Sequence, residues 1–335
     1  MTKSIIEIAG KIQSIRDMHF VTERDRNLTA QLSRLFKVTN GKLTHEPVRF
    51  TAGTETHGIT FIEGSGGGKS TAIAEVLSNF EPLVCNPETD KPRYLDVKVE
   101  SPATLRSLGV SMLLKLGGDK VSDRAKVYDI WGLVRHRLQV TGTTLVWLDE
   151  AHDMFRGTLS SETDNMFKML KSLMQGEHPV VLLLSGTERL SRITQIDPQV
   201  NRRFNKIRPR PLAFGTDNKR LVGLVTKCAE RADLEVSLQD DQINRLIYAS
   251  RYRFGRCIET TIHAIECALM DDVETLTIEH FELAWGQQEG CEIKENVFAA
   301  ENWMGIELED EDGDIFLKER DKAINKNKSR KKKVA

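Results

Sequence analysis

The sequence predicts an α/β fold in which helices flank a parallel β-sheet, with a helical extension before the sheet and a helical lid after it. From about Thr51, short apolar runs alternate with segments of helical periodicity, which is the pattern of parallel strands joined by crossover helices. The apolar runs occupy residues 59–62, 94–99, 145–148 and 180–184. After Pro211 the apolar residues recur at helical spacing, which predicts the lid.

Changes in the pattern of apolar and charged residues along the chain predict four regions. They are an N-terminal helical extension (1–50), an α/β core (51–212), a helical lid (213–288) and a charged C-terminal tail (289–335). The tail has an acidic stretch at 307–314 and a basic run at 326–333, and we expect it to be disordered until it binds a partner. The basic run could hold DNA, dock on an acidic surface, or be a solvated end without a specific task.

The composition excludes several classes of protein. The 48 lysines and arginines nearly balance the 49 acidic residues, so composition alone indicates neither a nucleic acid nor a membrane as partner. The 5 cysteines form no CxxC pair, and the first residues do not resemble a signal peptide, which predicts a reducing, cytoplasmic setting. No apolar run reaches the roughly 18 residues of a membrane span, so we expect a soluble protein without a membrane partner.

A glycine-rich loop follows the first apolar run and precedes a helix-forming segment. Its glycines allow successive N–H groups to turn toward phosphate oxygens, Lys69 can reach the outer phosphates, and the Ser70 hydroxyl can ligate magnesium. The alternative is a flexible Gly-Ser linker that happens to contain Gly-Lys-Ser. Because a strand precedes the loop and a helix follows it, we predict a site for ATP and Mg²⁺ in the core. The predicted binding residues are Gly64, Ser65, Gly66, Gly67, Gly68, Lys69, Ser70 and Thr71.

The loop departs from the phosphate-loop consensus at its first position. The pattern G-x-x-x-x-G-K-[ST] requires glycine where this chain has Glu63, and Gly64 comes one place later. The start of the loop is therefore expected to adopt an altered turn and to carry a carboxylate near the phosphates. The rate of hydrolysis is the property that this departure makes hardest to predict.

Two carboxylates end the apolar run at 145–148. Asp149 and Glu150 are predicted at the carboxyl edge of the sheet, where Asp149 would orient the magnesium shell and Glu150 the attacking water. The alternative is a buried strand that ends in a solvated acidic turn. His152 completes the string Asp-Glu-Ala-His, and it receives no role because a histidine two places beyond the acids is more often on a helix surface.

Three further positions are candidates for sensing the nucleotide. Thr187, with Ser185 as second choice, follows the run at 180–184 and could sense the γ-phosphate, although a Ser-Gly-Thr turn that caps a helix is an equal alternative. Arg203 lies in an Arg-Arg-Phe string and could reach the nucleotide of a neighbouring subunit, unless it belongs to a solvated helix face. Arg256 could bring a lid helix over the phosphates.

The order of these motifs resembles that of AAA+ ATPases over residues 51 to about 285. Within that family the chain is most similar to the transposition ATPases of the TniB, TnsC and MuB type, through Ser-Pro-Ala-Thr-Leu-Arg-Ser-Leu-Gly at 101–109, Leu-Ser-Gly-Thr-Glu-Arg-Leu at 184–190 and Gln-Val-Asn-Arg-Arg-Phe at 199–204. The resemblance implies an ATP-dependent regulator that forms rings or helical filaments on double-stranded DNA, receives a target-selection protein and stimulates a transposase. It gives Thr187 the role of first sensor, Arg203 that of trans-acting arginine and Arg256 that of lid sensor.

The same resemblance implies that the segment after the second strand meets the DNA backbone. The candidate contacts there are Thr104, Arg106, Lys120 and Arg124. Short polar and basic groups bind phosphates without base readout, which suits a protein that tolerates many target sequences. The alternative is an ordinary amphipathic helix, and both interpretations can hold on opposite faces.

Three other functions remain open at this point. Another AAA+ ATPase, such as an initiator, a clamp loader or a chaperone, would share every catalytic residue and differ in its partner. A DEAH helicase would need a second RecA-like domain, and the helical region after Pro211 lacks the strands for one. A nucleotide-gated DNA-binding scaffold would bind ATP with little hydrolysis.

Overall fold

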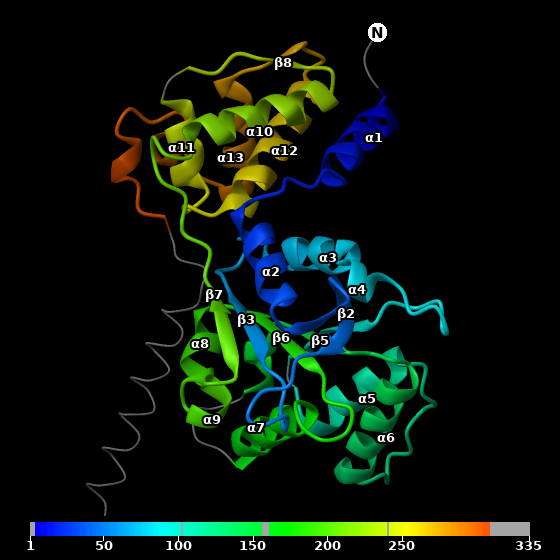
Figure 1. Ribbon diagram of the computed structural model, residues 1–335. Coiled ribbons are helices and arrows are strands. Elements are labelled where there is room, and N and C mark those ends of the chain that lie inside the picture. The colour runs from blue at the N-terminus through cyan, green and yellow to red at the C-terminus, as the bar shows by residue number, and fades with distance from the viewer. Residues whose placement is uncertain (1–3, 102, 156–160, 240, 309–335) are drawn as a thin grey trace, which may run out of the picture. The chain divides into compact units, whose positions relative to one another are not determined.

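The computed structural model describes residues 4–308 except 102, 156–160 and 240 (Figure 1). Of Ser161 it describes the backbone only. The chain divides into two compact units. Unit 1 comprises Met1–Phe20, Ser65–Gly68 and Pro211–Ala335, and unit 2 comprises Val21–Gly64 and Lys69–Arg210. Each unit is described by itself.

Unit 2 contains a five-stranded parallel sheet, as the sequence predicts. Its strands are β3 (Gly58–Ile62), β4 (Tyr94–Lys98), β5 (Leu145–Asp149), β6 (Val181–Gly186) and β7 (Phe204–Ile207). The order across the sheet is β4-β5-β6-β3-β7, so β6 separates β3 from β5. The edge strand β7 was not predicted, because its two central residues are exposed and its apolar pattern is too short to recognise.

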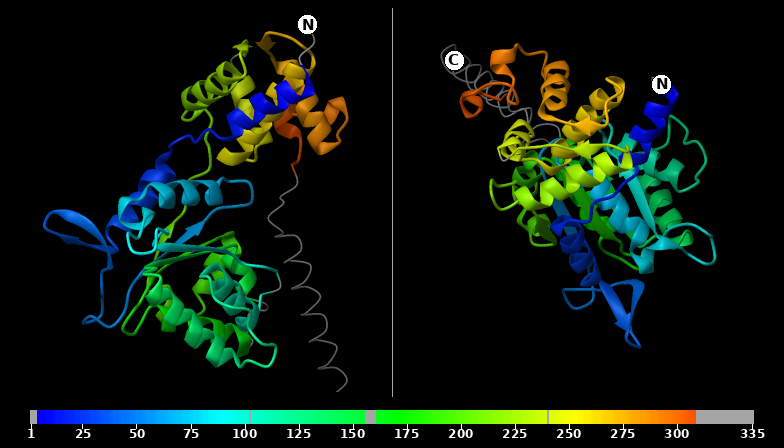
Figure 2. Two further views of the ribbon diagram at one scale, coloured as in Figure 1. Left: turned by 90° about the vertical axis from the view of Figure 1, so that its right-hand side faces the viewer. Right: turned by 90° about the horizontal axis from the view of Figure 1, so that it is seen from above.

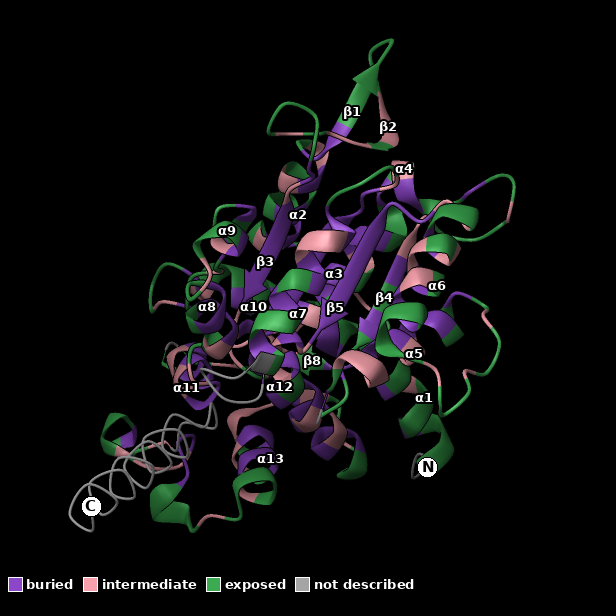
Figure 3. Ribbon diagram, turned by 90° about the horizontal axis from the view of Figure 1, so that it is seen from below, coloured by how far each residue is buried: buried purple, intermediate pink, exposed green. Residues whose placement is uncertain are grey.

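Both faces of the sheet are covered, which explains why β3, β5 and β6 are continuous apolar runs. In β5, Leu145 and Trp147 pack on one core while Val146 and Leu148 pack on another. Figure 1 shows α2 and α3 over one face and α5, α6 and α7 over the other, and Figure 3 shows β3 and β5 buried along their length. These helices are α2 (Glu23–Ser33), α3 (Lys69–Asn79), α5 (Leu105–Lys115), α6 (Val127–Val140) and α7 (Ser161–Leu173). This layered α/β architecture positions the carboxyl ends of β3, β5 and β6 at one edge.

Shorter elements complete unit 2. They are the hairpin strands β1 (Phe36–Thr39) and β2 (Lys42–Pro47), the helices α4 (Glu81–Val84), α8 (Glu188–Thr194) and α9 (Pro198–Asn201), and the 3₁₀ helix η1 (Ala151–Met154). The hairpin, which projects from the unit in Figure 2, corrects the prediction of a purely helical extension. Its turn is Asn40-Gly41, with φ values of 53° and 75°. An Asn-Gly pair is the usual sequence signal for such a turn.

Unit 1 is built mainly of helices. They are α1 (Ile5–Arg16), α10 (Asn218–Arg231), α11 (Gln242–Ala249), α12 (Phe254–Met270) and α13 (Ile278–Glu289). Ile8, Ile12 and Ile15 place the apolar stripe of α1 in the same core as the lid helices. Two short strands, β8 (Glu235–Val236) and β9 (Thr275–Leu276), pair in parallel, so the interpretation of this region as entirely helical was incomplete.

The first part of the predicted tail packs into unit 1. Residues 289–308 include η2 (Ile293–Glu295) and η3 (Trp303–Gly305), and the buried side chains of Val297, Phe298 and Trp303 belong to the core of the unit. The charged residues from Glu309 onward, including the basic run at 326–333, lie outside the described residues. All five cysteines are described, and all are free. No helix in the described parts of the chain has both the length and the apolar character to cross a membrane.

Candidate nucleotide site

The glycine-rich loop leaves the carboxyl end of β3 and leads directly into α3, which begins at Lys69. Gly66 and Gly68 have φ values of 72° and 97°, which side chains rarely adopt, so glycine is required at both positions. The first N–H groups of α3 lack intrahelical acceptors and carry the positive end of the helix dipole. The loop and helix terminus therefore form an arrangement that favours bound phosphate.

Asp149 is fixed by hydroxyl groups from two directions. The Ser70 hydroxyl donates to Asp149 Oδ2 at 2.8 Å, and the Ser185 hydroxyl donates to Asp149 Oδ1 at 2.6 Å. Trp147 Nε1 in turn donates to Ser185 Oγ at 2.8 Å. Ser185 can reach Asp149 because β6 lies beside β5 in the sheet. The structure thus brings together Ser70 and Asp149, the pair predicted to hold magnesium.

Glu150 contacts the phosphate-loop lysine. Its Oε1 lies 3.0 Å from Lys69 Nζ, and the Lys69 side chain is 7% exposed. The backbone of Glu150 is left-handed, with φ 53° and ψ 38°, which turns the chain sharply from β5 into η1. Strained conformations of this kind in residues other than glycine concentrate at functional sites.

His152, which received no role from the sequence, belongs to this cluster. Its Nδ1 lies 3.3 Å from Glu150 Oε2, and its side chain is 15% exposed. Burial lowers the pKa of His152, while the carboxylates of Asp153 and Glu150 act in the opposite direction. A Cβ at Gly186, the last residue of β6, would lie 2.9 Å from His152 Nδ1, so the close approach of the ring requires glycine there. No sequence signal distinguishes this histidine from one on a helix surface.

The donor set fits the cofactors predicted from the sequence. A hydroxyl and a carboxylate are the oxygen ligands that Mg²⁺ prefers, and Ser70 and Asp149 provide them in contact with each other. Lys69 and the loop N–H groups provide the positive charge that phosphates need.

The two choices for the sensor on β6 occupy different environments. Ser185 is fully buried in the hydrogen-bond chain with Asp149 and Trp147. Thr187 is half-buried at the N-cap of α8, where its side chain makes no capping hydrogen bond. The sequence favoured Thr187, while Ser185 is the residue that contacts the predicted magnesium ligand.

Arg203 lies at the opposite end of β3 from the phosphate loop. It is 4% exposed, and its guanidinium is paired with the carboxylate of Glu55, which is 1% exposed. The neighbouring Arg202 also contacts Glu55, at 2.9 Å, with its side chain 53% exposed. The Arg203 carbonyl accepts the N–H of Gly58 at the amino end of β3 at 2.8 Å. Within unit 2, Arg203 therefore does not lie beside Asp149 and Glu150. Arg202 is the more exposed of the two arginines.

Glu55 remains charged although it is buried. Burial raises the pKa of Glu55, but hydrogen bonds from Thr51 and Arg203 and the charge of Arg203 outweigh it, and the net shift is downward. Thr51 Oγ1 donates to Glu55 Oε1 at 2.6 Å, and Gln175 Nε2 donates to Oε2 at 3.3 Å. This cluster ties the chain before β3 to the chain before β7.

Unit 1 includes the loop residues Ser65–Gly68 together with the start of α12. The Gly255 N–H donates to the Gly67 carbonyl at 3.1 Å, and Arg253 Nη1 donates to the Ser65 carbonyl at 2.8 Å. A Cβ at Gly66 would lie 2.9 Å from Arg256 Cγ, so Arg256 lies against the loop. Burial and the nearby charges of Arg251 and Arg253 lower the pKa of Arg256.

The candidate DNA contacts divide into structural and exposed groups. The Thr104 hydroxyl caps α5 by accepting the Ser107 N–H at 3.0 Å. Arg106 donates to the carbonyls of Ser122, at 2.8 Å, and Ala125, and so holds the loop that follows α5. Lys120 and Arg124 are exposed on that loop.

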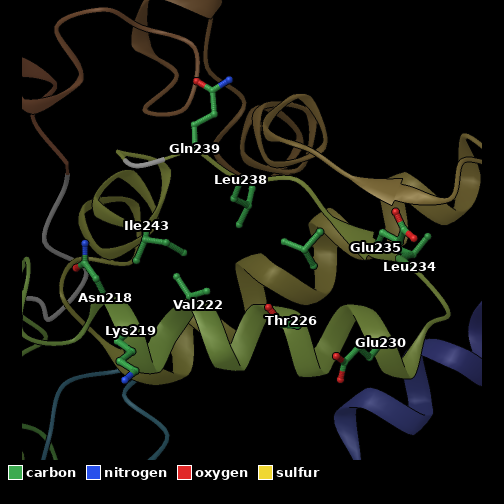
Figure 4. A pocket seen from close by; sticks show the side chains of 11 residues that line it. Asn218, Lys219, Val222, Thr226, Glu230, Leu234, Glu235, Leu238, Gln239 and Ile243 are labelled. Atoms are coloured by element: carbon green, nitrogen blue, oxygen red, sulfur yellow. The ribbon is translucent and has the colours of Figure 1, made fainter.

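A groove of about 660 Å³ lies elsewhere, on unit 1 (Figure 4). Its walls come from α10, the segment 234–239 and Ile243 on α11. None of the residues predicted to bind nucleotide or DNA lines it. The groove therefore provides no alternative to the site at the sheet edge.

Comparisons with known proteins give a family match and a fold. The family model described as "Bacterial TniB protein" matches residues 12–212, which is more than half of the chain. A search of curated proteins finds no match.

Three of the solved structures that resemble this chain are archaeal proteins. The ORC1 protein of Aeropyrum pernix, in complex with DNA, is 14% identical over 83% of this chain and 69% of its own, with a TM-score of 0.57. The ORC2 protein of Aeropyrum pernix, in ADPNP-ADP complexes, is 17% identical over 84% of this chain and 75% of its own, with a TM-score of 0.55. Cdc6p of Pyrobaculum aerophilum is 13% identical over 81% of this chain and 69% of its own, with a TM-score of 0.55. These likenesses confirm the predicted AAA+ fold.

Proposed function

Because the chain belongs to the TniB family, we propose that it is an ATP-dependent regulator of DNA transposition. It binds and hydrolyses ATP with Mg²⁺, assembles on double-stranded DNA as a ring or helical filament, and connects a target-selection protein with a transposase. The observation that carries this proposal is the convergence of Lys69, Ser70, Asp149 and Glu150 at one edge of the sheet.

Each residue of the cluster has a task in hydrolysis. Lys69 exchanges its contact with Glu150 for the outer phosphates, which leaves Glu150 able to orient a water for attack. Ser70 and Asp149 hold the metal, and Ser185 keeps the Asp149 carboxylate in one orientation. Bound Mg²⁺ neutralises charge on the phosphate oxygens.

The remaining predicted residues act around this centre. Thr187 senses the γ-phosphate, Arg256 contacts the nucleotide from the lid, and Arg203 acts on the nucleotide of a neighbouring subunit. For Arg203 this role requires its contact with Glu55 to open, since the guanidinium is buried in unit 2. The more exposed Arg202 is the second candidate for the same task.

DNA is bound through its backbone without sequence preference. Lys120 and Arg124 are exposed on the loop after α5, Thr104 lies at the start of that helix, and Arg106 keeps the loop in place. The archaeal ORC1 relative was solved in complex with DNA, which supports this part of the proposal. Each phosphate that a subunit neutralises adds about −0.9 to the slope of log affinity against log salt concentration, so assembly on DNA should depend steeply on salt.

Two variants test the assignment of the catalytic residues. Lys69→Ala should abolish nucleotide binding and assembly on DNA, because it removes the main cation from the phosphate site. Glu150→Gln should keep binding, stabilise the assembly and lower phosphate release by about 100-fold or more. The measurements are calorimetry with Mg-ATP, phosphate release, and negative-stain imaging with duplex DNA and a slowly hydrolysed ATP analogue. Equal behaviour of the two variants contradicts the assigned roles.

An initiator-type or clamp-loader-type ATPase is the second candidate, because the fold is that of the archaeal ORC proteins. Continuous filaments along duplex favour the transposition regulator, while isolated particles at fixed sites favour an initiator. A nucleotide-gated scaffold predicts assembly with negligible phosphate release from the unaltered chain.

A further inference from the structure

The carboxylate at the start of the phosphate loop is paired with an arginine from α2. Arg24 Nη2 lies 3.2 Å from Glu63 Oε1, and Arg24 Nη1 lies 3.4 Å from Glu63 Oε2. The two side chains are 9% and 11% exposed. The Glu63 N–H donates to the Gly186 carbonyl at 3.1 Å, which fixes the backbone of Glu63 to the carboxyl end of β6. A two-pronged pair of this kind is specific to arginine.

The first turn of α2 is built to hold Arg24 in this place. The Thr22 N–H and hydroxyl both donate to Asp25 Oδ2 at 2.7 Å, which closes a capping box. Leu28 and Leu32 are fully buried in the core that also contains residues of α3, the helix that follows the phosphate loop. The cap and the core therefore fix the backbone of Arg24 beside Glu63.

Helix stability does not explain Arg24. The N-terminal turn of a helix carries positive partial charge, so a cation there is unfavourable and an acid favourable. Glu23 and Asp25 fit that rule, whereas Arg24 breaks it. Its pairing with Glu63 offsets the unfavourable position.

Glu63 places a negative charge where a polyphosphate must bind. It is the residue directly before Gly64, the first residue of the predicted phosphate site. An unneutralised carboxylate there would repel the nucleotide, and the repulsion would grow with the number of phosphate charges. Low exposure of the pair limits screening by salt.

From this geometry we propose that Arg24 is a positioning residue of the nucleotide site. It neutralises Glu63 and holds the start of the loop, so that a loop without the consensus glycine binds a nucleoside triphosphate. The inference rests on the proposed function, because it assigns Arg24 a task at the same phosphate site.

The test compares charge-neutral variants in a double-mutant cycle at pH 8. Arg24→Gln should weaken Mg-ATP binding by about tenfold, and ADP binding by less, because it leaves a carboxylate beside the phosphates. Glu63→Gln should bind Mg-ATP at least as tightly as the unaltered chain, because it leaves the Arg24 cation in place, and the double variant should bind within about twofold of the unaltered chain, because both charges are gone. Arg26→Gln is the matched control, since Arg26 is exposed in the same turn of α2 and its loss should change little. Calorimetry gives the affinities, and thermal unfolding shows that each variant is folded.

The outcomes separate this inference from the proposed function. Failure of the unaltered chain to bind Mg-ATP overturns both. Binding by the unaltered chain together with equal binding by Arg24→Gln overturns only the role of Arg24. Equal weakening in Arg24→Gln, Glu63→Gln and the double variant also overturns it, because the pair would then be only a structural clasp. If Arg24→Gln does not fold, Arg24→Lys replaces it, because lysine keeps the positive charge without the two-pronged contact. This variant should retain most of the affinity for Mg-ATP. A loss of that affinity overturns the inference.

Discussion

The two ends of β3 carry ion pairs that differ in burial and in how their partners are arranged. At the amino end, Glu55 contacts Thr51, Gln175, Arg202 and Arg203, so its oxygens are bound by side chains of unit 2. At the carboxyl end, the Lys69–Glu150 pair lies where a glycine-rich loop meets the first turn of a helix. The Arg203 and Glu55 side chains are 5% and 2% exposed, whereas those of Lys69 and Glu150 are 7% and 27% exposed.

The difference shows that the surroundings of an ion pair, and not the pairing alone, indicate function. Glu55 and Arg203 connect segments that flank the amino ends of strands, where a parallel sheet does not bind ligands. Lys69 and Glu150 lie at the carboxyl ends, next to N–H groups that lack acceptors within the helix. A nucleotide bound in the same chain can replace Glu150 as the partner of Lys69, whereas the nucleotide proposed for Arg203 belongs to a neighbouring subunit and requires the contact with Glu55 to open.

The largest effect on stability is expected at the amino end. Arg203→Ala should lower the free energy of unfolding by about 3–5 kcal/mol, because it leaves the buried Glu55 carboxylate without its main partner. Chemical denaturation followed by circular dichroism measures the loss. Arg202→Ala is the matched control and should cost about 1 kcal/mol or less, since that side chain is half exposed. Equal losses of unfolding free energy in the two variants would show that Arg203 is not the main partner of Glu55 at the amino end of β3.

Much of the fold follows from patterns visible in the sequence. Strands β3, β5 and β6 were predicted because both of their faces are buried, which makes them unbroken apolar runs, and β4 was predicted although its Asp96 and Lys98 are exposed. The lid was predicted from the helical spacing of apolar residues after Pro211, and α10, α11, α12 and α13 lie there. The hairpin at Asn40-Gly41 and the edge strand β7 were missed because their residues are largely exposed.

The site was predictable where its residues are neighbours of a motif, and not where they come from distant segments. Lys69, Ser70, Asp149 and Glu150 follow strand ends, so their convergence follows from the sheet. The pair between Arg24 and Glu63 joins residues 39 positions apart through the docking of α2, and no local pattern encodes it. The preference for Thr187 over Ser185 was a choice between two polar residues at one strand end, which depends on side-chain direction.

Separate variants of Ser185 and Thr187 can distinguish the roles of these two residues near the carboxyl end of β3. Ser185→Ala should raise the Mg²⁺ concentration needed for half-maximal hydrolysis by about tenfold, because Asp149 loses one of its two hydroxyl donors. Thr187→Ala should instead lower the turnover number without moving the Mg²⁺ requirement, if Thr187 senses the γ-phosphate. Phosphate release at varied Mg²⁺ distinguishes them. An unchanged Mg²⁺ requirement in Ser185→Ala would remove Ser185 from the site.

The smallest expected effect concerns the pH dependence of stability at the carboxyl end. Burial lowers the pKa of His152 below its ordinary value of 6.5, against the opposing charges of Asp153 and Glu150. The unfolded chain therefore binds a proton at a higher pH than the folded chain, so His152 stabilises the fold above pH 6.5 and this contribution is lost as the pH falls. His45 and His57 are shifted in the same direction by burial and should add to the loss.

His152→Asn should thus flatten the decline in unfolding free energy between about pH 7 and pH 5, while the unaltered chain keeps the full slope. His136→Asn, at an exposed position of α6, is the control and should leave the slope unchanged. Urea denaturation at a series of pH values measures both. Identical slopes in all three chains would show that the burial of His152 contributes nothing to the linkage between protonation and folding.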